Sequence, residues 1–337
     1  MNFIKFILII TIHISYAQAE FSFDKIEIPG SGHLSEVLQI NTNSFAFVYK
    51  SSGYVSIRNN KLLEVDSVDF AQQIYNIGLS PDKSKMAATL TGTGDIVEID
   101  IESKSERIWS FELTQSVIGL LDIVYHTNDE LLITRIGNNG NPVPAISLNT
   151  DTSHATDFGF HGFRSGIFAI DRERSFLYLA EPTSPVQLNK LDLMEPGYPI
   201  VAEDSHDISS SAIFNMDINP EKTKLVTTEG DVIRTSSIQI EYRLPSSLVY
   251  RGINYFSSDG TEIWALNFHN TNDLFFFSVQ DYSLIDQIND LHSKCGGHIS
   301  GFHKLNHKRK WLVSGDGFVC LLLFEDDIFL SGFEQLQ

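Results

Sequence analysis

The sequence predicts an all-β protein, a seven-bladed β-propeller of four-stranded antiparallel blades, and two observations predict it. First, a polar residue opens a turn between two apolar runs at seven places, which are Asn41, Ser80, His126, Asp171, Asn219, Ser257 and Asn306. These markers are 39, 46, 45, 48, 38 and 49 residues apart, and a repeat of roughly 40 to 50 residues built from short strands is typical of a propeller. Second, the residue before each marker and the residue six positions after it are apolar in every copy.

This pattern predicts that each repeat begins with a β-hairpin that buries one face. The clearest copies are residues 77–86, 216–225 and 254–263. In the second repeat, further strands are expected at Gly94–Asp100 and Arg107–Phe111. One blade cannot bury both of its faces alone, so blades stack on their neighbours, and a closed ring leaves only short sheet edges. A β-sandwich with evenly spaced strands is the alternative, but seven phased copies exceed what a sandwich requires.

The second repeat also carries a family resemblance. Its turn Leu79–Asp82, followed by the strand Gly94–Asp100, resembles blades of the YVTN/TolB-type, WD40-like propeller superfamily. The resemblance extends over nearly the whole chain after its first residues. It implies the propeller fold and does not imply an activity, because it rests on residues that build blades.

An N-terminal strand is expected to close the ring. Phe23–Gly30 has strand character and leads directly into the first repeat. It would form the outermost strand of the last blade and pair with Phe318–Phe324. The C-terminal segment Ile328–Phe333 is the alternative for the same position.

The first residues predict export. Residues 1–19 contain Lys5, a short apolar core and the sequence Ala17-Gln18-Ala19, the pattern of a cleavable signal peptide. An uncleaved membrane anchor is the alternative. Residues 20–337 are expected to form a single propeller domain, since no Gly/Ser-rich or Pro-rich linker divides them. We expect a secreted or periplasmic monomer that does not insert into the membrane after signal cleavage, because no later segment has about 18 uninterrupted apolar residues.

The charge excludes some partners. The formal net charge is −19, and loss of Lys5 with the signal peptide would make it −20. Such a surface repels phosphate backbones, so nucleic-acid binding is not expected. The one basic cluster, His303–Lys310, falls on the hairpin turn of the seventh repeat, where we expect a solvated loop.

The two cysteines, Cys295 and Cys320, are candidates for a disulfide, which an exported protein permits. The bridge would reinforce the ring where it closes. A buried free thiol at Cys320 is one alternative. A metal site is a weaker one, since His292, Cys295 and His298 are spaced to reach one ion, and it is incompatible with the disulfide.

Ligands of propellers usually bind where the loops before the innermost strands converge at the mouth of the central tunnel. The repeat places five polar residues in those loops, namely His33, Gln73, Arg164, Arg251 and His298. Arginine and histidine side chains from several blades would hold a small anionic ligand such as a carboxylate. Alternatively, Arg164 and Arg251 neutralise nearby acids such as Glu36 or Asp171.

The sequence contains no strong catalytic motif, neither Gly-x-Ser-x-Gly nor His-Glu-x-x-His, and it indicates no cofactor. The favoured hypothesis is an exported propeller that binds a protein or a small ligand through the mouth of the tunnel. The alternative is an enzyme of the lactonase, lyase or quinoprotein type with its active site at the same mouth. The chain resembles those enzymes in architecture alone.

Overall fold

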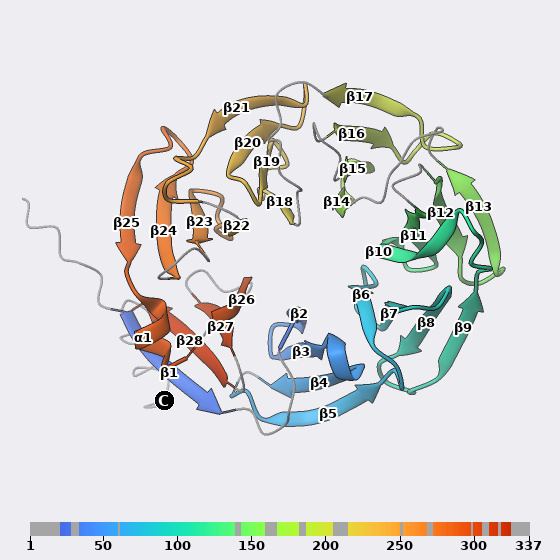
Figure 1. Ribbon diagram of the computed structural model, residues 1–337, viewed down its shortest axis with the longest axis horizontal. Helices are drawn as coiled ribbons and strands as arrows, with labels where there is room; N and C mark the ends of the chain where they lie inside the picture. Colours follow the sequence, from blue (N-terminus) through green and yellow to red (C-terminus); the bar gives the residue numbers. More distant parts are fainter. Residues whose placement is uncertain are drawn as a thin grey trace, which may run out of the picture.

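The computed structural model describes residues 21–27, 34–59, 61–138, 143–158, 167–181, 187–204, 215–249, 252–267, 272–297, 299–304, 310–315 and 318–324. In this part of the chain the strands form seven four-stranded antiparallel sheets. The sheets are arranged as the blades of a ring around a central opening (Figure 1). The predicted seven-bladed β-propeller is therefore confirmed.

The first four blades follow one another along the chain, each running from its innermost to its outermost strand. Blade 1 comprises β2 (Glu36–Asn41), β3 (Ser44–Tyr49), β4 (Tyr54–Asn59) and β5 (Glu64–Asp69). Blade 2 comprises β6 (Ile74–Leu79), β7 (Lys85–Leu90), β8 (Asp95–Asp100) and β9 (Glu106–Ser110). Blade 3 comprises β10 (Val117–Thr127), β11 (Glu130–Gly137), β12 (Ala145–Asn149) and β13 (His154–Phe158). Blade 4 comprises β14 (Ile167–Asp171), β15 (Phe176–Glu181), β16 (Gln187–Asp192) and β17 (Ile200–Asp204).

The remaining blades complete the ring. Blade 5 comprises β18 (Met216–Ile218), β19 (Lys224–Thr227), β20 (Asp231–Arg234) and β21 (Gln239–Arg243). Blade 6 comprises β22 (Ile253–Phe256), β23 (Glu262–Asn267), β24 (Asp273–Ser278) and β25 (Leu284–Ile288). Blade 7 comprises β26 (Ile299–Lys304), β27 (Lys310–Gly315), β28 (Phe318–Phe324) and β1 (Phe21–Glu27). In the described residues, two short helices interrupt this pattern, η1 (Lys50–Ser52) between β3 and β4 and α1 (Leu291–Cys295) between β25 and β26.

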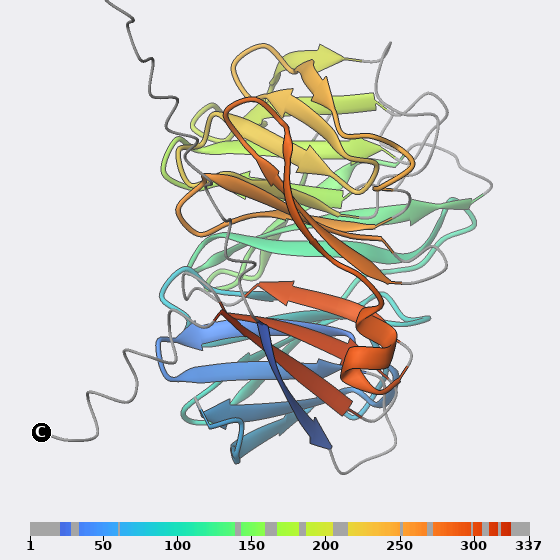
Figure 2. The same ribbon diagram turned by 90° about the vertical axis from the view of Figure 1, so that its left-hand side faces the viewer.

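The N-terminal strand closes the ring, as the sequence predicts. β1 is the outermost strand of blade 7 and pairs antiparallel with β28, from Phe21 opposite Phe324 to Glu27 opposite Phe318. The alternative closing segment, Ile328–Phe333, lies outside the described residues. The helix α1 lies against this closure, beside β1 (Figure 2).

The hairpin turns follow the predicted chemistry in the clearest copies. Ser80 Oγ donates to Asp82 Oδ1 at 2.7 Å, and Ser257 Oγ donates to Asp259 Oδ1 at 2.8 Å. One marker is misplaced by the sequence pattern: His126 does not open the turn but lies within β10, which continues to Thr127. The marker Asn306 lies outside the described residues.

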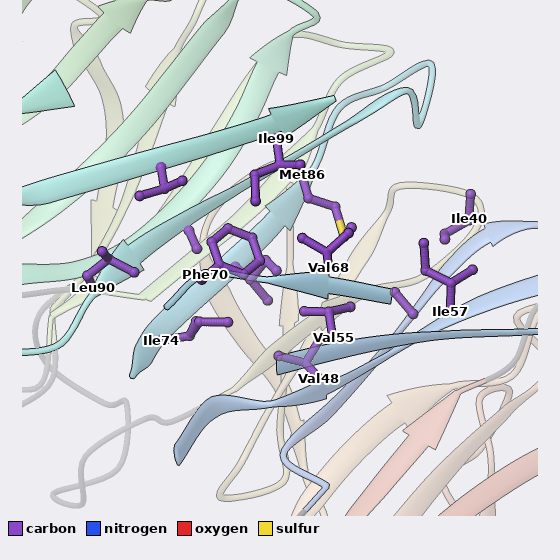
Figure 3. Packing of buried hydrophobic residues seen from close by; sticks show 14 residues of the cluster. Ile40, Val48, Val55, Ile57, Val68, Phe70, Ile74, Met86, Leu90 and Ile99 are labelled. Atoms are coloured by element: carbon purple, nitrogen blue, oxygen red, sulfur yellow. The ribbon is translucent and has the colours of Figure 1, made fainter. Parts of the chain in front are cut away.

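The hydrophobic core lies between neighbouring blades, since each sheet is too thin to bury its own faces. Between blades 1 and 2, Val48, Val55 and Val68 pack in one buried cluster with Met86 and Ile99 (Figure 3). The run of phenylalanines in β24 belongs to this kind of core. Phe275, Phe276 and Phe277 are 5%, 3% and 1% exposed.

Each of blades 1 to 6 also reaches back to the blade before it from the turn that precedes its outermost strand. One residue of this turn has a left-handed backbone, and these residues are Leu62, Lys104, Ser153, Tyr198, Ile238 and Tyr282. Two examples show the contact: Lys104 Nζ donates to Asp66 of blade 1, and Trp109 Nε1 of blade 2 donates to Ser153 Oγ at 3.1 Å. A positive φ costs conformational energy in a residue other than glycine. The contacts between blades offset this cost in six blades.

Among the residues that the structure describes, no helix has the length and apolar character needed to cross a bilayer.

Candidate functional site

The innermost strands surround a central cavity. Because the four strands of a blade alternate in direction, each blade ends on the face where the next innermost strand begins. We call this face the funnel face. A cavity of about 630 Å³ lies between the innermost strands, and every blade contributes lining residues to it.

β-Bulges aim polar side chains into this cavity. The strand pairing shifts register between Ile74 and Asn76 in β6 and between Leu120 and Ile123 in β10, and such bulges redirect a side chain locally. The backbone N–H of three lining residues donates to a threonine hydroxyl of the adjacent strand, in the pairs Asn76–Thr89 at 3.1 Å, Asp122–Thr134 at 2.9 Å and Asn215–Thr228 at 2.8 Å. The same backbone-to-threonine hydrogen bond therefore holds a polar residue at the cavity in blades 2, 3 and 5.

A chain of polar contacts runs across four blades on one side of the cavity. Lys50 Nζ lies 3.2 Å from Glu36 Oε2 and donates to Asn76 Oδ1 at 3.1 Å. Asn76 Nδ2 in turn donates to Asp122 Oδ1. The backbone N–H of Phe168 donates to Asp122 Oδ2 at 2.7 Å. We call this group, Glu36, Lys50, Asn76 and Asp122, the polar wall.

The position of Lys50 follows from a close approach between blades 1 and 2. Lys50 belongs to η1, which ends at Gly53 with a φ of 71°. A Cβ atom at Gly53 would lie 2.0 Å from the carbonyl oxygen of Gln72, so only glycine fits there. This contact brings η1 against the segment that leads into β6 and places Lys50 beside Asn76.

Asp122 is the most perturbed acid in the cavity. The side chain is buried, with the residue only 7% exposed. Burial raises the pKa of its carboxyl group to about 6, although the N–H groups of Phe168 and Ile123 act in the opposite direction. Glu36 raises this pKa further and Lys50 lowers it, so all three charged groups share one electrostatic environment.

The opposite side of the cavity is aromatic. Tyr255 of β22 and Phe302 of β26 line it, with ring centroids 6.0 Å apart. Phe302 stacks on Trp311 at 4.7 Å. Asn215 Nδ2 donates to the Tyr255 hydroxyl at 3.2 Å, and burial raises the pKa of that hydroxyl. We call Tyr255 and Phe302 the aromatic wall.

His303 corrects the sequence-based expectation for the basic cluster. Instead of lying in a solvated loop, His303 belongs to β26, is 5% exposed and lines the cavity. Its Nε2 lies 2.9 Å from Ser314 Oγ. Burial, with a smaller effect from Lys50, lowers its pKa to about 3, so it is neutral at physiological pH. Residues 305–309 of the cluster lie outside the described part of the chain.

Of the five ligand-binding candidates from the sequence, only one lies among the described residues. Gln73 is exposed, precedes β6 and does not line the cavity. His33, Arg164, Arg251 and His298 lie outside the described residues. The two acids that the arginines were expected to neutralise have other cations beside them. Glu36 pairs with Lys50, and Arg174 Nε lies 4.0 Å from Asp171 Oδ2.

The cysteines form a bridge in the structure. Cys295 of α1 and Cys320 of β28 are joined by a disulfide with their Cα atoms 5.7 Å apart. It connects α1 to the strand that pairs with β1, at the closure of the ring. A cysteine in a disulfide has no thiolate to offer a metal ion, and His298 of the alternative metal site lies outside the described residues. Within the described residues no group of three ligating side chains is placed to hold a metal ion.

Sequence reasoning missed the polar wall, although a signal for it was present. Each of these polar residues precedes its threonine by a similar interval, 13 residues for Asn76, 12 for Asp122 and 13 for Asn215. The prediction projected the repeat onto the loops before the innermost strands, and in blade 2 this gave Gln73, which precedes Asn76 in the chain.

These features define the class of protein, a seven-bladed propeller with a polar central cavity. No protein-family model matches the sequence, and no curated protein sequence matches it. Among solved structures, the β-propeller domain of Cps50 (Swd1) from Myceliophthora thermophila is similar, with a TM-score of 0.68 and 12% identity over 88% of this chain and 99% of that one.

A chain in the crystal structure of the mitotic checkpoint complex is similar as well. Its TM-score is 0.69, with 13% identity over 96% of this chain and 98% of the other. Both neighbours are WD40 propellers, which supports the WD40-like fold. At such low identities the likeness establishes the fold and transfers no residue roles.

Proposed function

We propose that the protein is an exported propeller that binds a protein partner through the funnel face. The observation that carries this proposal is the central cavity, which is open to a ligand and lined by polar side chains from several blades. The similar solved structures support a scaffold role for the protein, since one of them was solved as part of a complex. Many activities share this architecture, so the proposal rests on the surface of this chain and not on its fold alone.

Two exposed apolar side chains on the funnel face support a protein partner. Tyr75 and Ile118 are 42% and 50% exposed and lie in the first residues of the innermost strands β6 and β10. Tyr75 directly precedes Asn76 of the polar wall. Aromatic and aliphatic side chains around a polar depression are typical of the anchor residues of protein interfaces.

Export is part of the proposal. It rests on residues 1–19, whose sequence has the pattern of a signal peptide. The disulfide between Cys295 and Cys320 is consistent with it, since disulfides persist mainly in oxidising compartments. Sequencing the N-terminus of the protein recovered from the producing cell's exterior or periplasm tests this, and an intact Met1 in that fraction would contradict signal cleavage.

The binding proposal is tested by comparing two double variants in affinity capture with cross-linking from the native extracellular or periplasmic fraction. Tyr75→Ser/Ile118→Ser removes the apolar groups of the funnel face, and we expect it to lose the partner that the native chain retains. Leu284→Ser/Ile285→Ser is the matched control, because these residues are similarly exposed, 44% and 53%, but lie on the outermost strand β25. Equal capture by both variants would refute binding through the funnel face.

A second candidate function is an enzyme with its active site at the cavity. One observation favours it: Asp122 lines the cavity with a pKa raised to about 6, which suits an acid or base near neutral pH. Against it, three N–H groups already donate to the Asp122 carboxylate. Lactone hydrolysis that falls by at least about 100-fold in Asp122→Asn would favour the enzyme, and unchanged turnover would remove this candidate.

A further inference from the structure

Lys50 shows what kind of group the polar wall binds. Its ammonium group reaches from η1 to the Glu36 carboxylate at 3.2 Å and to the Asn76 carbonyl oxygen at 3.1 Å. The lysine side chain is 28% exposed and sits on a helix of one turn. The wall therefore already holds a primary ammonium, supplied by a short segment of the protein itself.

The described lining of the cavity carries more negative than positive charge. Among its described lining residues, Glu36 and Asp122 are acids, Lys50 is a base, and His303 is neutral at physiological pH. Lys50 is already paired with Glu36, while the described groups that donate hydrogen bonds to Asp122 are uncharged N–H groups. An uncompensated carboxylate in a partly desolvated cavity attracts a cation more strongly than the same group in water.

The aromatic wall provides the other half of a site for an amphipathic cation. Tyr255 and Phe302 line the same cavity from blades 6 and 7, where Tyr255 is partly exposed and Phe302 is fully buried against it. Aromatic faces accommodate the aliphatic stem of a lysine or arginine and attract its charged end. A cavity of about 630 Å³ is large enough to admit one such side chain.

We propose that the cavity receives a lysine or arginine side chain of the protein partner, which displaces the ammonium of Lys50 from Glu36 and Asn76. The incoming cation lies between the polar wall and the aromatic wall, and Asp122 supplies the charge that holds it. The described cavity thus favours a cationic group, whereas the sequence led us to expect an anionic ligand on the basis of Arg164 and Arg251. This inference rests on the proposed function and specifies the chemistry of the contact.

The test uses n-butylammonium ions as a probe that matches the lysine side chain. We expect saturable binding, followed by the NMR signals of the Asn76 side-chain amide, to be at least tenfold tighter in Lys50→Ala than in the unmodified protein. Lys50→Met keeps most of the aliphatic stem and should gain less. In the Lys50→Ala background, Glu36→Gln or Asp122→Asn should each weaken binding of the probe several-fold.

Butan-1-ol and butyrate are the controls for charge. Equal binding of butanol would show a merely apolar pocket, and absence of saturable n-butylammonium binding to Lys50→Ala would show that the Lys50–Glu36 pair is only structural. Either result overturns the proposal. Binding should also be stronger at pH 7.5 than at pH 5, since protonation of Asp122 removes its charge, with Glu36 and Lys50 as its charged neighbours.

The outcome is distinguishable from failure of the proposed function. If the funnel-face variants lose the partner while the probe does not bind, the protein-binding proposal stands and the lysine or arginine contact falls. If the probe binds as expected but Tyr75→Ser/Ile118→Ser retains the partner, the cavity binds cations and the partner docks elsewhere.

Discussion

Blade 3 holds two acidic side chains eight residues apart that differ in what their surroundings do to the charge. Asp122 faces the central cavity, and burial raises its pKa to about 6. Glu130 lies at the contact with blade 4, where its pKa is lowered to about 2. The fold stabilises the ionised form of Glu130 and destabilises the ionised form of Asp122.

The donors explain the difference. Burial alone would raise the pKa of Glu130, but hydrogen bonds from three side chains outweigh it. His126 Nδ1 lies 2.8 Å from Glu130 Oε2, Ser147 Oγ donates to Oε1 at 2.5 Å, and the Tyr198 hydroxyl of blade 4 donates to Oε1 as well. Asp122 is buried more deeply, and its N–H donors do not compensate for the lost hydration.

This contrast separates a structural site from a candidate functional one. A carboxylate that joins two blades gains stability from its ionised form, as Glu130 does. A carboxylate kept ionised in a cavity against its surroundings lowers stability at neutral pH, and strained or perturbed groups of that kind concentrate at functional sites. We therefore attribute the blade contact to Glu130 and assign Asp122 to the proposed binding site.

The largest effect is expected from removing the stabilised carboxylate. Glu130→Ala leaves Tyr198, His126 and Ser147 without their common acceptor, and we expect the free energy of unfolding at pH 7 to fall by about 3–4 kcal/mol. Because the folded-state pKa is lowered, this contribution is present above the unfolded value near 4.5 and is lost as the pH falls toward 2. Urea denaturation at pH 7 and pH 3 measures it.

Glu173→Ala is the control for that experiment, since Glu173 is an exposed acid in a hairpin turn of blade 4. It removes the same charge without breaking a contact between blades, and it should change stability by less than about 0.5 kcal/mol. A loss in Glu130→Ala no larger than in this control would show that the blade contact does not depend on Glu130.

A smaller effect of opposite pH dependence is expected at Asp122. Its folded-state pKa is raised from 3.8 to about 6, so its contribution to stability is present below about 3.8 and is lost as the pH rises through 6. Between pH 4 and pH 7.5, the free energy of unfolding of the unmodified protein should fall by roughly 2–3 kcal/mol relative to that of Asp122→Asn. Parallel stability curves for the two proteins would contradict an ionised, poorly compensated Asp122.

The sequence predicts the ring well because blade formation depends on local patterns. The apolar residues that flank Ser80 and Ser257 mark hairpins by spacing alone, and Phe23–Gly30 identifies the closing strand because it precedes the first repeat. These features require no knowledge of which residues meet across blades.

The cavity is harder to predict because it depends on register at the level of single residues. A bulge just before Asn76 and another at Asp122 decide which side chains face the axis, and the apolar spacing that identifies the repeats does not reveal them. Lys50 reaches the cavity from η1, outside any innermost strand, and His303 is buried although its neighbours in sequence are basic. The spacing of apolar residues likewise does not predict the left-handed turn residues that join blades.

The smallest effect is expected from removing a single hydroxyl group, that of Tyr198, beside Glu130. Tyr198→Phe removes one of the three donors to Glu130 and keeps the ring that packs edge-on against Phe158 at 5.1 Å. We expect the free energy of unfolding at pH 7 to fall by about 1 kcal/mol. The pKa of Glu130 should rise, so that acid unfolding begins at a higher pH.

Tyr282→Phe is the matched variant, since Tyr282 has the same left-handed turn position in blade 6 and donates to Glu241 Oε1 at 2.9 Å. Glu241 keeps Lys224 and Arg234, each 3.0 Å away, so the acid side of its stability curve should move less than in Tyr198→Phe. Equal shifts in the two variants would mean that the cations contribute no more than the hydroxyl groups do. In that case the kind of donor would no longer explain why the pKa is low for Glu130 and raised for Asp122, and depth of burial would have to explain the whole difference.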